Sequence, residues 1–383
     1  MQRHYFDHNA TTPVAPDVLG AMTACLAEVY GNASSIHHFG QRAKQALEAA
    51  RRQVAERIGA RPREIVFVSG GTETDNLAIL GTLRPGAGHA VTTSVEHPAV
   101  LHAFQELERQ GTAVTYVPVG SAGVVDPDDV RRAVRPATAL ISVMHANNET
   151  GALQPIEAIA AVAREAGIAF HSDGVQAAPR LPVNVRALGV DFYALSGHKM
   201  YAPKGIGALY VREGAALRSI AFGGHHERER RPGTENVAGA VAMGAAAQSA
   251  TFETGTLRDR LEAGILAAVP DAHVNCADSP RLPNTTNMRF DGIEGEPLVI
   301  ALDLRGFAVS SGAACSSGAV EPSHVLTAIG LTPSEARSSL RFSLGRSNSE
   351  ADVDALIEAV RDSVQHLRRI APRRITPRSL AHA

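Results

Sequence analysis

The sequence predicts an α/β fold built around a mostly parallel, seven-stranded sheet. Seven short apolar runs, each with the length and composition of a buried strand, alternate with helix-like segments between residues 65 and 211. Short loops with glycine and proline join them, and polar residues follow most of the runs. Apolar strands that alternate with helices are typical of a parallel sheet covered on both faces. In such a sheet a ligand is expected where the strands end.

The first sixty residues are predicted to be mostly helical. A polar turn at 5–12 precedes Pro13 and Pro16, which open a helix-like segment to about residue 29, and a loop of turn formers follows at 31–35. From residue 40 to 58, apolar residues recur three and four positions apart, which predicts an amphipathic helix.

The central part of the chain carries the predicted sheet. Strands are expected at 65–68, 90–95, 113–117, 139–143, 168–171, 192–195 and 207–211. Helices are expected through residue 80 after the turn at 69–75, and at 99–109, 127–134, 156–165 and 233–250.

The pattern becomes less regular near residue 250. A final helix is predicted from 350 to about 370, before a basic tail broken by proline. We therefore expect a large domain at 13–252 and a smaller α+β domain formed by 1–12 and 253–383.

The bulk composition excludes several classes of function. The 383 residues have a net charge of −2, with 44% hydrophobic and 20% charged residues, which gives no indication of nucleic-acid or membrane-surface binding. No stretch has the length of a membrane span, and the first residues do not resemble a signal peptide. Three cysteines, Cys25, Cys276 and Cys315, are too few for a disulfide framework or a zinc site, and they fit a reducing cytoplasm.

Lys199 follows the predicted strand at 192–195, in the tetrapeptide Ser196-Gly197-His198-Lys199. A partly desolvated lysine at such a position can be neutral and nucleophilic, as covalent bonding to an aldehyde requires. The alternative is an ordinary solvated lysine in a loop.

A possible phosphate cradle follows the strand at 65–68. Gly71 and Thr72 lie in a turn that opens a helix, where free backbone N–H groups favour an anion. The spacing matches neither a Walker loop nor the Gly-x-Gly-x-x-Gly dinucleotide motif. The alternative is a tight turn in which Thr72 caps the helix.

Other predicted strands also end in chemically capable residues. Asp173 is a carboxylate in apolar surroundings that would need a partner such as a protonated ring nitrogen, or could cap a turn. His97 could stack on a flat ligand or carry a proton, although a structural role is the commoner one for any single histidine. The segment His145–Glu149 follows a fourth strand. His225 and His226 lack the spacing of a metal site, and no resident metal is expected.

These groups should converge because the ends of parallel strands meet at one edge of the sheet. A phosphate cradle, a carboxylate for a ring nitrogen, a stacking histidine and a lysine together suit pyridoxal 5'-phosphate.

The chain resembles the cysteine desulfurases of the NifS and IscS kind, which belong to the class V aminotransferases of pyridoxal-phosphate fold type I. The matching segments follow the family's order along the whole chain: Asp7–Thr12, Gly31–Ser35, Ser69–Asn76, Val95–His97, Met144–Glu149, Ser196–Lys199, Arg231–Glu235, Ser310–Gly318 and Ser339–Gly345. Pro232 and Gly174 differ from the commonest motif letters.

The resemblance implies roles around the cofactor. Lys199 would hold its aldehyde, His97 would stack on its ring, Asp173 would pair with the ring nitrogen and Gln176 would touch the ring hydroxyl. The cofactor-binding set implied is Gly71, Thr72, His97, Asn148, Asp173, Gln176, Ser196, His198, Lys199 and Thr234. Thr234 would reach the phosphate of a neighbouring subunit, so a homodimer is implied.

The resemblance also implies the chemistry. Asn148 and Arg341 would bind the carboxylate of L-cysteine, Lys199 would take the Cα proton, and His97 would carry a proton. Cys315, in a loop of small residues at 310–318, would accept the sulfur as a persulfide and leave L-alanine. That persulfide would meet an iron–sulfur cluster only transiently.

Three alternatives stay open at this point. One is a selenocysteine lyase or another class V aminotransferase-type enzyme. The others are an interaction protein that keeps the fold without the chemistry and a dinucleotide-binding enzyme. The sequence does not identify the sulfur acceptor, which could be an iron–sulfur scaffold protein, nitrogenase maturation or tRNA thiolation.

Overall fold

The structure is a computed structural model that describes residues 2–249, 254–311 and 321–370. Its larger region holds a seven-stranded sheet in the order β2-β8-β7-β6-β5-β3-β4. All neighbouring strands are parallel except that β8 runs antiparallel to both β2 and β7. The predicted mostly parallel, seven-stranded sheet is therefore confirmed. The strands are β2 (Ile65–Val68), β3 (His89–Thr93), β4 (Ala113–Val117), β5 (Thr138–Ser142), β6 (Ala169–Asp173), β7 (Phe192–Ser196) and β8 (Gly207–Val211).

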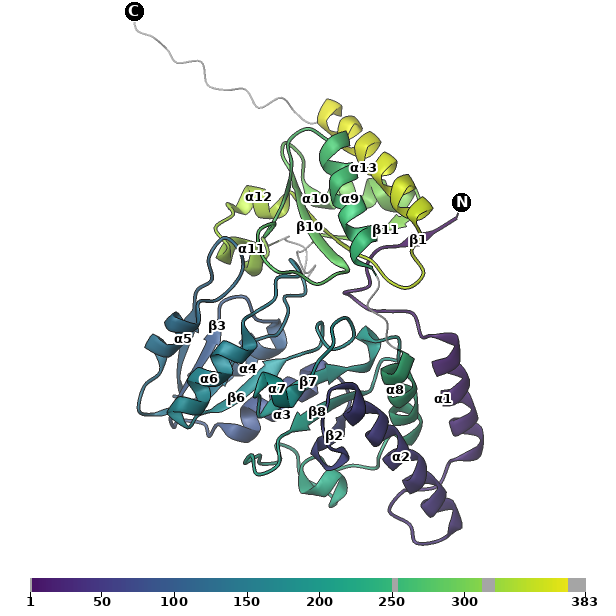
Figure 1. Cartoon of the computed structure of the whole chain (residues 1–383), viewed down its shortest axis with the longest axis vertical. Helices are drawn as coiled ribbons and strands as arrows, with labels where there is room; N and C mark the ends of the chain where they lie inside the picture. The colour runs from purple at the N-terminus through teal and green to yellow at the C-terminus, as the bar shows by residue number, and fades with distance from the viewer. Residues whose placement is uncertain (1, 250–253, 312–320, 371–383) are drawn as a thin grey trace, which may run out of the picture.

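Helices cover both faces of this sheet, as Figure 1 shows. One face packs against α1, α2, α6 and α8, and the opposite face packs against α3 and α4. The helices of this region are α1 (Pro16–Glu28), α2 (His38–Arg57), α3 (Gly71–Thr82), α4 (Pro98–Arg109), α5 (Pro127–Ala133), α6 (Ile156–Ala166), α7 (Val185–Leu188) and α8 (Val237–Ser249), with 3-10 turns η1 (Pro62–Glu64), η2 (Gly197–Lys199) and η3 (His226–Glu229).

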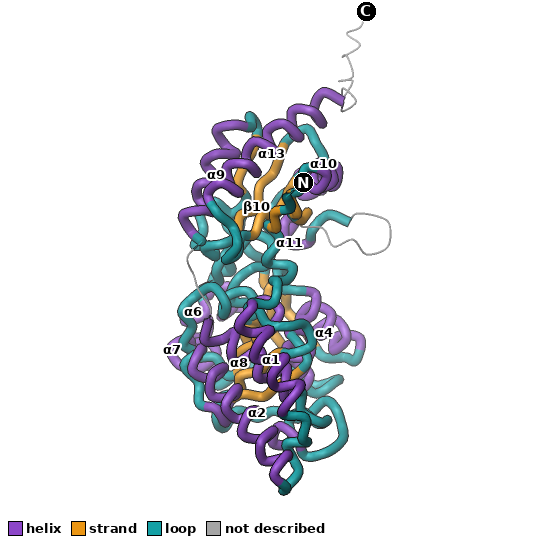
Figure 2. Tube along the Cα trace, turned by 90° about the vertical axis from the view of Figure 1, so that its right-hand side faces the viewer, coloured by secondary structure: helices purple, strands orange, loops and turns teal. Residues whose placement is uncertain are grey.

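A smaller region forms the upper part of Figure 1. Its antiparallel sheet has the order β12-β13-β10-β9, and β1 pairs in parallel with β11. Figure 2 shows α9, α10 and α13 gathered at this end of the molecule, away from α1, α2 and α8. The elements are β1 (His4–Tyr5), α9 (Gly255–Ala268), β9 (Ala272–Val274), β10 (Thr285–Phe290), α10 (Gly295–Leu304), β11 (Phe307–Ala308), β12 (Ser310–Ser311), α11 (His324–Ala328), α12 (Pro333–Arg337), β13 (Ser339–Ser343) and α13 (Glu350–Ile370).

The two regions have separate hydrophobic cores. The larger core is drawn from buried residues between positions 15 and 247, and the smaller one joins Phe6 to buried residues between 261 and 364. Smaller buried clusters join the two regions, for example through Ala152 and Leu326, and the domain limits stay a prediction.

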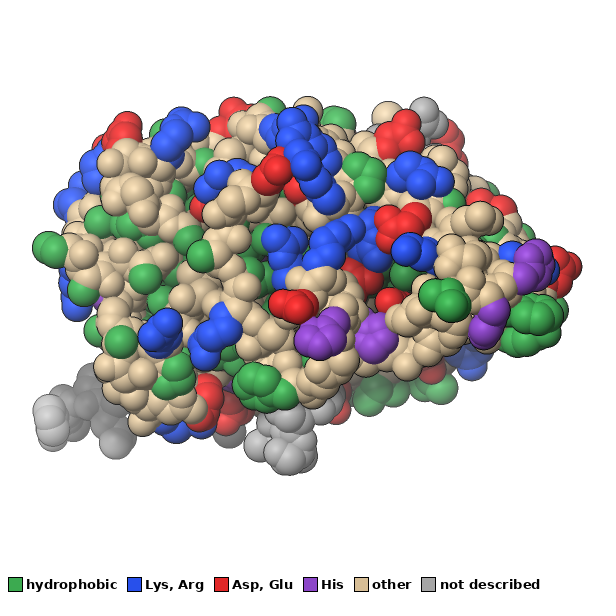
Figure 3. Space-filling model, turned by 90° about the horizontal axis from the view of Figure 1, so that it is seen from below, with side chains coloured by type: hydrophobic (Ala, Val, Ile, Leu, Met, Phe, Trp, Pro, Cys, Tyr) green, Lys and Arg blue, Asp and Glu red, His purple; other side chains and the backbone are tan. Residues whose placement is uncertain are grey.

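The surface carries both signs of charge. Seen from below, basic side chains gather across the middle of the face, with acidic side chains among them (Figure 3). None of the helices among the described residues is long and apolar enough to cross a membrane.

Three local predictions were wrong. The last helix of the larger region begins at Val237 rather than residue 233, because Gly233 has φ +103° and the Asn236 side chain accepts the N–H of Gly239 at 2.9 Å. Thr72 does not cap α3, since the helix already begins at Gly71. Strand β3 ends at Thr93, so residues 94–95 form a turn. The predicted cysteine loop at 310–318 is described only for its first two residues, because 312–320 lie outside the described residues, as does the tail at 371–383.

Candidate functional site

A cavity of about 300 Å³ lies at the ends of the sheet strands, where the two regions meet. It brings together ten residues singled out from the sequence: Gly71, Thr72, His97, Asn148, Asp173, Gln176, Ser196, His198, Lys199 and Arg341. Two other predicted residues are not placed there. Thr234 is exposed and does not line this cavity, and Cys315 lies outside the described part of the chain.

Lys199 lies in η2, directly after β7, and its amine points toward the N-terminal segment. Nζ donates to the carbonyl oxygens of Asn9 at 2.6 Å and Ala10 at 2.7 Å. Burial lowers the pKa of Lys199 to about 7, with smaller contributions from the nearby cations Arg341 and Arg180. A neutral amine has two N–H donors, which match the two carbonyls. Lys199 is therefore prepared to act as a nucleophile or base near neutral pH.

The N-terminal segment is held against this lysine by hydrogen bonds. The backbone N–H and the hydroxyl of Thr12 both donate to the His198 carbonyl at 2.9 Å. The Gln176 amide donates to the Asn9 carbonyl at 3.0 Å. Residues near the start of the chain thus form one wall of the cavity.

One end of the cavity suits an anion. Helix α3 begins at Gly71, so its first backbone N–H groups have no partner within the helix. The Ser196 hydroxyl is buried without a hydrogen-bond partner among the described residues. His198 Nδ1 lies 3.1 Å from the Thr11 hydroxyl, and burial lowers its pKa to about 4, so its ring is neutral. These groups fit a phosphate.

Asp173 lies at the end of β6. Its Oδ1 accepts the Val175 N–H at 2.9 Å, so it also caps a turn. Burial raises the pKa of Asp173, while His97 and Lys199 act in the opposite direction. Two other buried carboxyls, Glu96 and Asp75, interact electrostatically with Asp173. Burial raises the pKa of Glu96 to about 8 and that of Asp75 well above its usual range. A protonated ring nitrogen would supply the counter-charge that Asp173 requires.

His97 combines the two roles that the sequence left open. It is the N-cap of α4, where its Nδ1 accepts the Ala99 N–H at 3.1 Å, and its ring lines the cavity. Burial lowers the pKa of His97, so the ring is neutral with its proton on Nε2.

The smaller region closes the cavity with Arg341 on β13. Its terminal nitrogens donate to the Asn148 carbonyl at 3.0 Å and to Asp7 Oδ1 at 2.7 Å, while Nε is buried without a partner among the described residues. A guanidinium carries five N–H donors, so donors remain for a carboxylate.

Several lining residues had no role assigned from the sequence. Asn9 and Ala10 belong to a matched segment, but their contribution is a backbone carbonyl, which no side-chain pattern reveals. Asp75 lies one helical turn beyond Thr72, and this i, i+3 spacing was the available signal. Its Oδ1 lies 3.4 Å from His171 Nε2. The remaining residues of this kind are Met144 and Val175.

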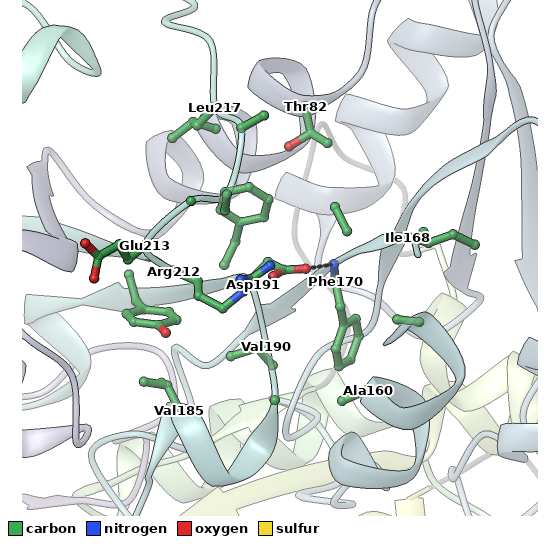
Figure 4. A pocket seen from close by; sticks show the side chains of 18 of the residues that line it. Thr82, Ala160, Ile168, Phe170, Val185, Val190, Asp191, Arg212, Glu213 and Leu217 are labelled. Carbon is green, nitrogen blue, oxygen red and sulfur yellow. Dashed lines mark hydrogen bonds and ion pairs between the residues drawn. The ribbon is translucent and has the colours of Figure 1, made fainter. Parts of the chain in front are cut away.

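A larger cavity, about 1360 Å³, opens at the other edge of the sheet and contains none of the predicted site residues. Figure 4 shows Asp191 at its centre, accepting the Phe170 N–H at 2.8 Å and facing Arg212. Arg212 satisfies this carboxylate, so we assign the pair a structural role. No group of three or more His, Cys, Asp or Glu residues able to hold a metal ion occurs within the described ranges.

Comparison with known proteins agrees with this geometry. Residues 4–356 match the family model described as aminotransferase class-V. A cysteine desulfurase of Nostoc sp. (strain PCC 7120) is 48% identical over 377 residues, covering 96% of this chain and 94% of the relative.

Two solved structures extend the comparison. A NifS-like protein superposes with a TM-score of 0.88 at 34% identity, covering 96% of this chain and all of the other. A structure described as SspA in complex with cysteine has a TM-score of 0.81 at 38% identity, covering 89% of this chain and 98% of the other. The chain therefore belongs to the class V aminotransferase family, among relatives named cysteine desulfurase.

Proposed function

We propose that this protein is a cysteine desulfurase, which converts L-cysteine to L-alanine and leaves the sulfur as a persulfide on Cys315. The observation that carries the proposal is the buried Lys199 amine, whose pKa is lowered to about 7 inside a cavity that also holds Asp173, His97 and Arg341. The relatives named cysteine desulfurase support the same activity.

The cavity fits pyridoxal 5'-phosphate. The unpartnered Ser196 hydroxyl, the start of α3 at Gly71 and Thr72, and His198 would hold the phosphate. Asp173 would face the ring nitrogen, His97 the ring face, and Gln176 the ring hydroxyl. When bound, the cofactor supplies an electron sink for the charge left when an amino acid loses its Cα proton.

The protein's own groups would handle the substrate and its protons. The free N–H donors of Arg341, beside Asn148, would bind the carboxylate of L-cysteine. Neutral Lys199 would accept the Cα proton, and the Nε2 proton of His97 would be available for transfer. The Cys315 thiolate would form an S–S bond with the substrate sulfur as the C–S bond breaks. The carbon keeps that bonding pair and takes up a proton to become the methyl group of alanine.

We also propose a homodimer in which Thr234 reaches the cavity of the partner subunit. Thr234 is exposed and does not line the cavity of its own chain. Large apolar side chains are exposed on α1, on the loop after it, at the start of α2 and at position 222, as a subunit interface would require: Leu19, Leu26, Tyr30, Ile36, Phe39 and Phe222. Light scattering of the purified protein should give twice the mass of the chain. A monomer that retains full activity would contradict this assembly.

The test of the activity is product analysis with L-cysteine. We expect equimolar alanine and persulfide, and the Cys315→Ser variant should bind the cofactor normally but form no alanine. Borohydride reduction should attach the cofactor to the peptide that contains Lys199. 3-Mercaptopyruvate in place of alanine would instead indicate an aminotransferase, and a strong preference for selenocysteine would indicate a selenocysteine lyase.

The acceptor of the persulfide sulfur is proposed to be a second protein in the cytoplasm, such as an iron–sulfur scaffold. Cys25 and Cys276 are free and buried, which fits a reducing compartment.

A further inference from the structure

The side chain of Tyr193 fills the space next to Gly174, the residue that follows the proposed cofactor partner Asp173. Gly174 follows Asp173 at the end of β6, and Tyr193 lies on the adjacent strand β7. A Cβ atom added at Gly174 would overlap ring carbons Cζ and Cε1 of Tyr193 and would lie 2.5 Å from its hydroxyl. Tyr193 is completely buried, so its ring cannot move aside without disturbing the core. Only glycine therefore fits at position 174 while tyrosine occupies position 193.

The Tyr193 ring is in turn held by His145. The hydroxyl lies 2.7 Å from His145 Nδ1, and the two rings meet edge to face with centroids 5.9 Å apart. Burial lowers the pKa of His145 to about 4, so the neutral ring can accept the hydroxyl proton at Nδ1. The backbone N–H of the same His145 donates to the carbonyl of Asp173 at 2.9 Å.

These contacts link Asp173 back to its own neighbour. The Asp173 carbonyl is hydrogen-bonded to the His145 backbone, the His145 ring is hydrogen-bonded to Tyr193, and Tyr193 packs against Gly174, the residue after Asp173. The His145 bond holds the Asp173 backbone, whereas the only hydrogen bond to the Asp173 carboxylate among the described residues comes from the Val175 N–H, on the far side of Gly174. The peptide that carries the carboxylate is thus confined from two directions.

We propose that Tyr193, Gly174 and His145 are positioning residues that set the place of the Asp173 carboxylate, and through it the ring nitrogen of the bound cofactor. This inference rests on the proposed function, because it concerns how the proposed cofactor is held. None of the three residues lines the cavity, so they act through Asp173 alone.

The experiment measures the dissociation constant of pyridoxal phosphate and the absorption maximum of the bound cofactor, using full-length protein freed of cofactor. Gly174→Ala should weaken cofactor binding by about tenfold or more, since an extra methyl group overpacks the core. Adding Tyr193→Leu to that variant makes room for the methyl group and should recover binding to about fivefold weaker than wild type, because leucine also lacks the hydroxyl. Tyr193→Phe retains the ring but loses the hydroxyl, and should weaken binding about fivefold and shift the absorption maximum.

Tyr210→Phe is the matched control. Tyr210 is buried in the next strand, opposite Tyr193, and borders the larger cavity at the other edge of the sheet. It should leave both readouts unchanged.

Two results would overturn the inference. One is a double variant that binds cofactor no better than Gly174→Ala. The other is a Tyr193→Phe variant that cannot be distinguished from Tyr210→Phe, and this comparison decides the matter if Gly174→Ala does not fold. If wild-type protein fails to bind pyridoxal phosphate at all, the proposed function fails instead.

Discussion

The lowered pKa of Lys199 makes a quantitative prediction about cofactor capture. Burial lowers this pKa from 10.5 to about 7. At pH 7 about half of the Lys199 amines are then neutral, whereas an amine with the ordinary value would be neutral in only about one molecule in 3000. Only the neutral amine attacks an aldehyde, so this difference should appear directly in the rate.

The assay is stopped-flow absorbance of pyridoxal phosphate mixed with cofactor-free protein across a series of pH values. The rate at which Lys199 attaches covalently to the cofactor aldehyde should rise tenfold per pH unit below 7. It should level off above pH 7, because protonation of Lys199 no longer limits the reaction there. Lys199→Ala should remove the signal, and a short peptide with one lysine supplies the reference for an unburied amine. A rate that continues to rise tenfold per unit up to about pH 9 would refute the argument that burial and neighbouring cations prepare this lysine.

Three further predictions concern stability and substrate binding. Arg51 and Glu227 form a bidentate ion pair at 2.7 and 2.8 Å, and both side chains are only 3% exposed. Arg51→Met should therefore lower the free energy of unfolding in urea by about 3–5 kcal/mol, because it leaves the Glu227 charge buried and unpaired. Asp354→Asn, which breaks an exposed ion pair, is the control and should leave the urea midpoint unchanged. Burial raises the pKa of Glu149 from 4.5 to about 7, so between these values the folded state binds more protons than the unfolded state. The free energy of unfolding should therefore fall as the pH rises through this window. Glu149→Gln should make the free energy of unfolding less dependent on pH there, and an unchanged dependence would contradict the assignment. Arg341→Lys should raise the KM for cysteine about tenfold with little change in cofactor affinity, because lysine cannot make the two parallel hydrogen bonds of a guanidinium to a carboxylate. An equal loss of cofactor affinity would show that Arg341 does not act on the substrate carboxylate alone.

The strands and helices of the larger region were largely predictable because their patterns are local. β2, β4 and β8 have the predicted bounds, and the other four strands differ by three residues or fewer at either end. Each is a short apolar run between turn formers, and a buried strand needs little more than that. The start of α8 was misplaced because Gly233 before it has a positive φ, which composition alone does not reveal.

The site residues that could be predicted from the sequence are those that lie at the ends of strands. Thr72, His97, Asp173 and Lys199 come from four segments, and a parallel sheet brings strand ends to one edge. The electrostatics were not predictable in this way. The pKa of Lys199 depends first on burial and then on Arg341 and Arg180, which approach it only in the folded chain.

The sequence by itself determined the alternation of elements, the family and most of the residues around the cavity, since each follows from patterns a few residues long. The tertiary structure decided what distant segments do to each other. The pairing of β1 with β11 places the first residues of the chain beside the smaller region, and the segment that follows brings the carbonyls of Asn9 and Ala10 to Lys199. The contact of Tyr193 with Gly174 gives a physical reason for a glycine beside Asp173. Such contacts join positions about 20 to 300 residues apart, and only the packing of the whole chain specifies them.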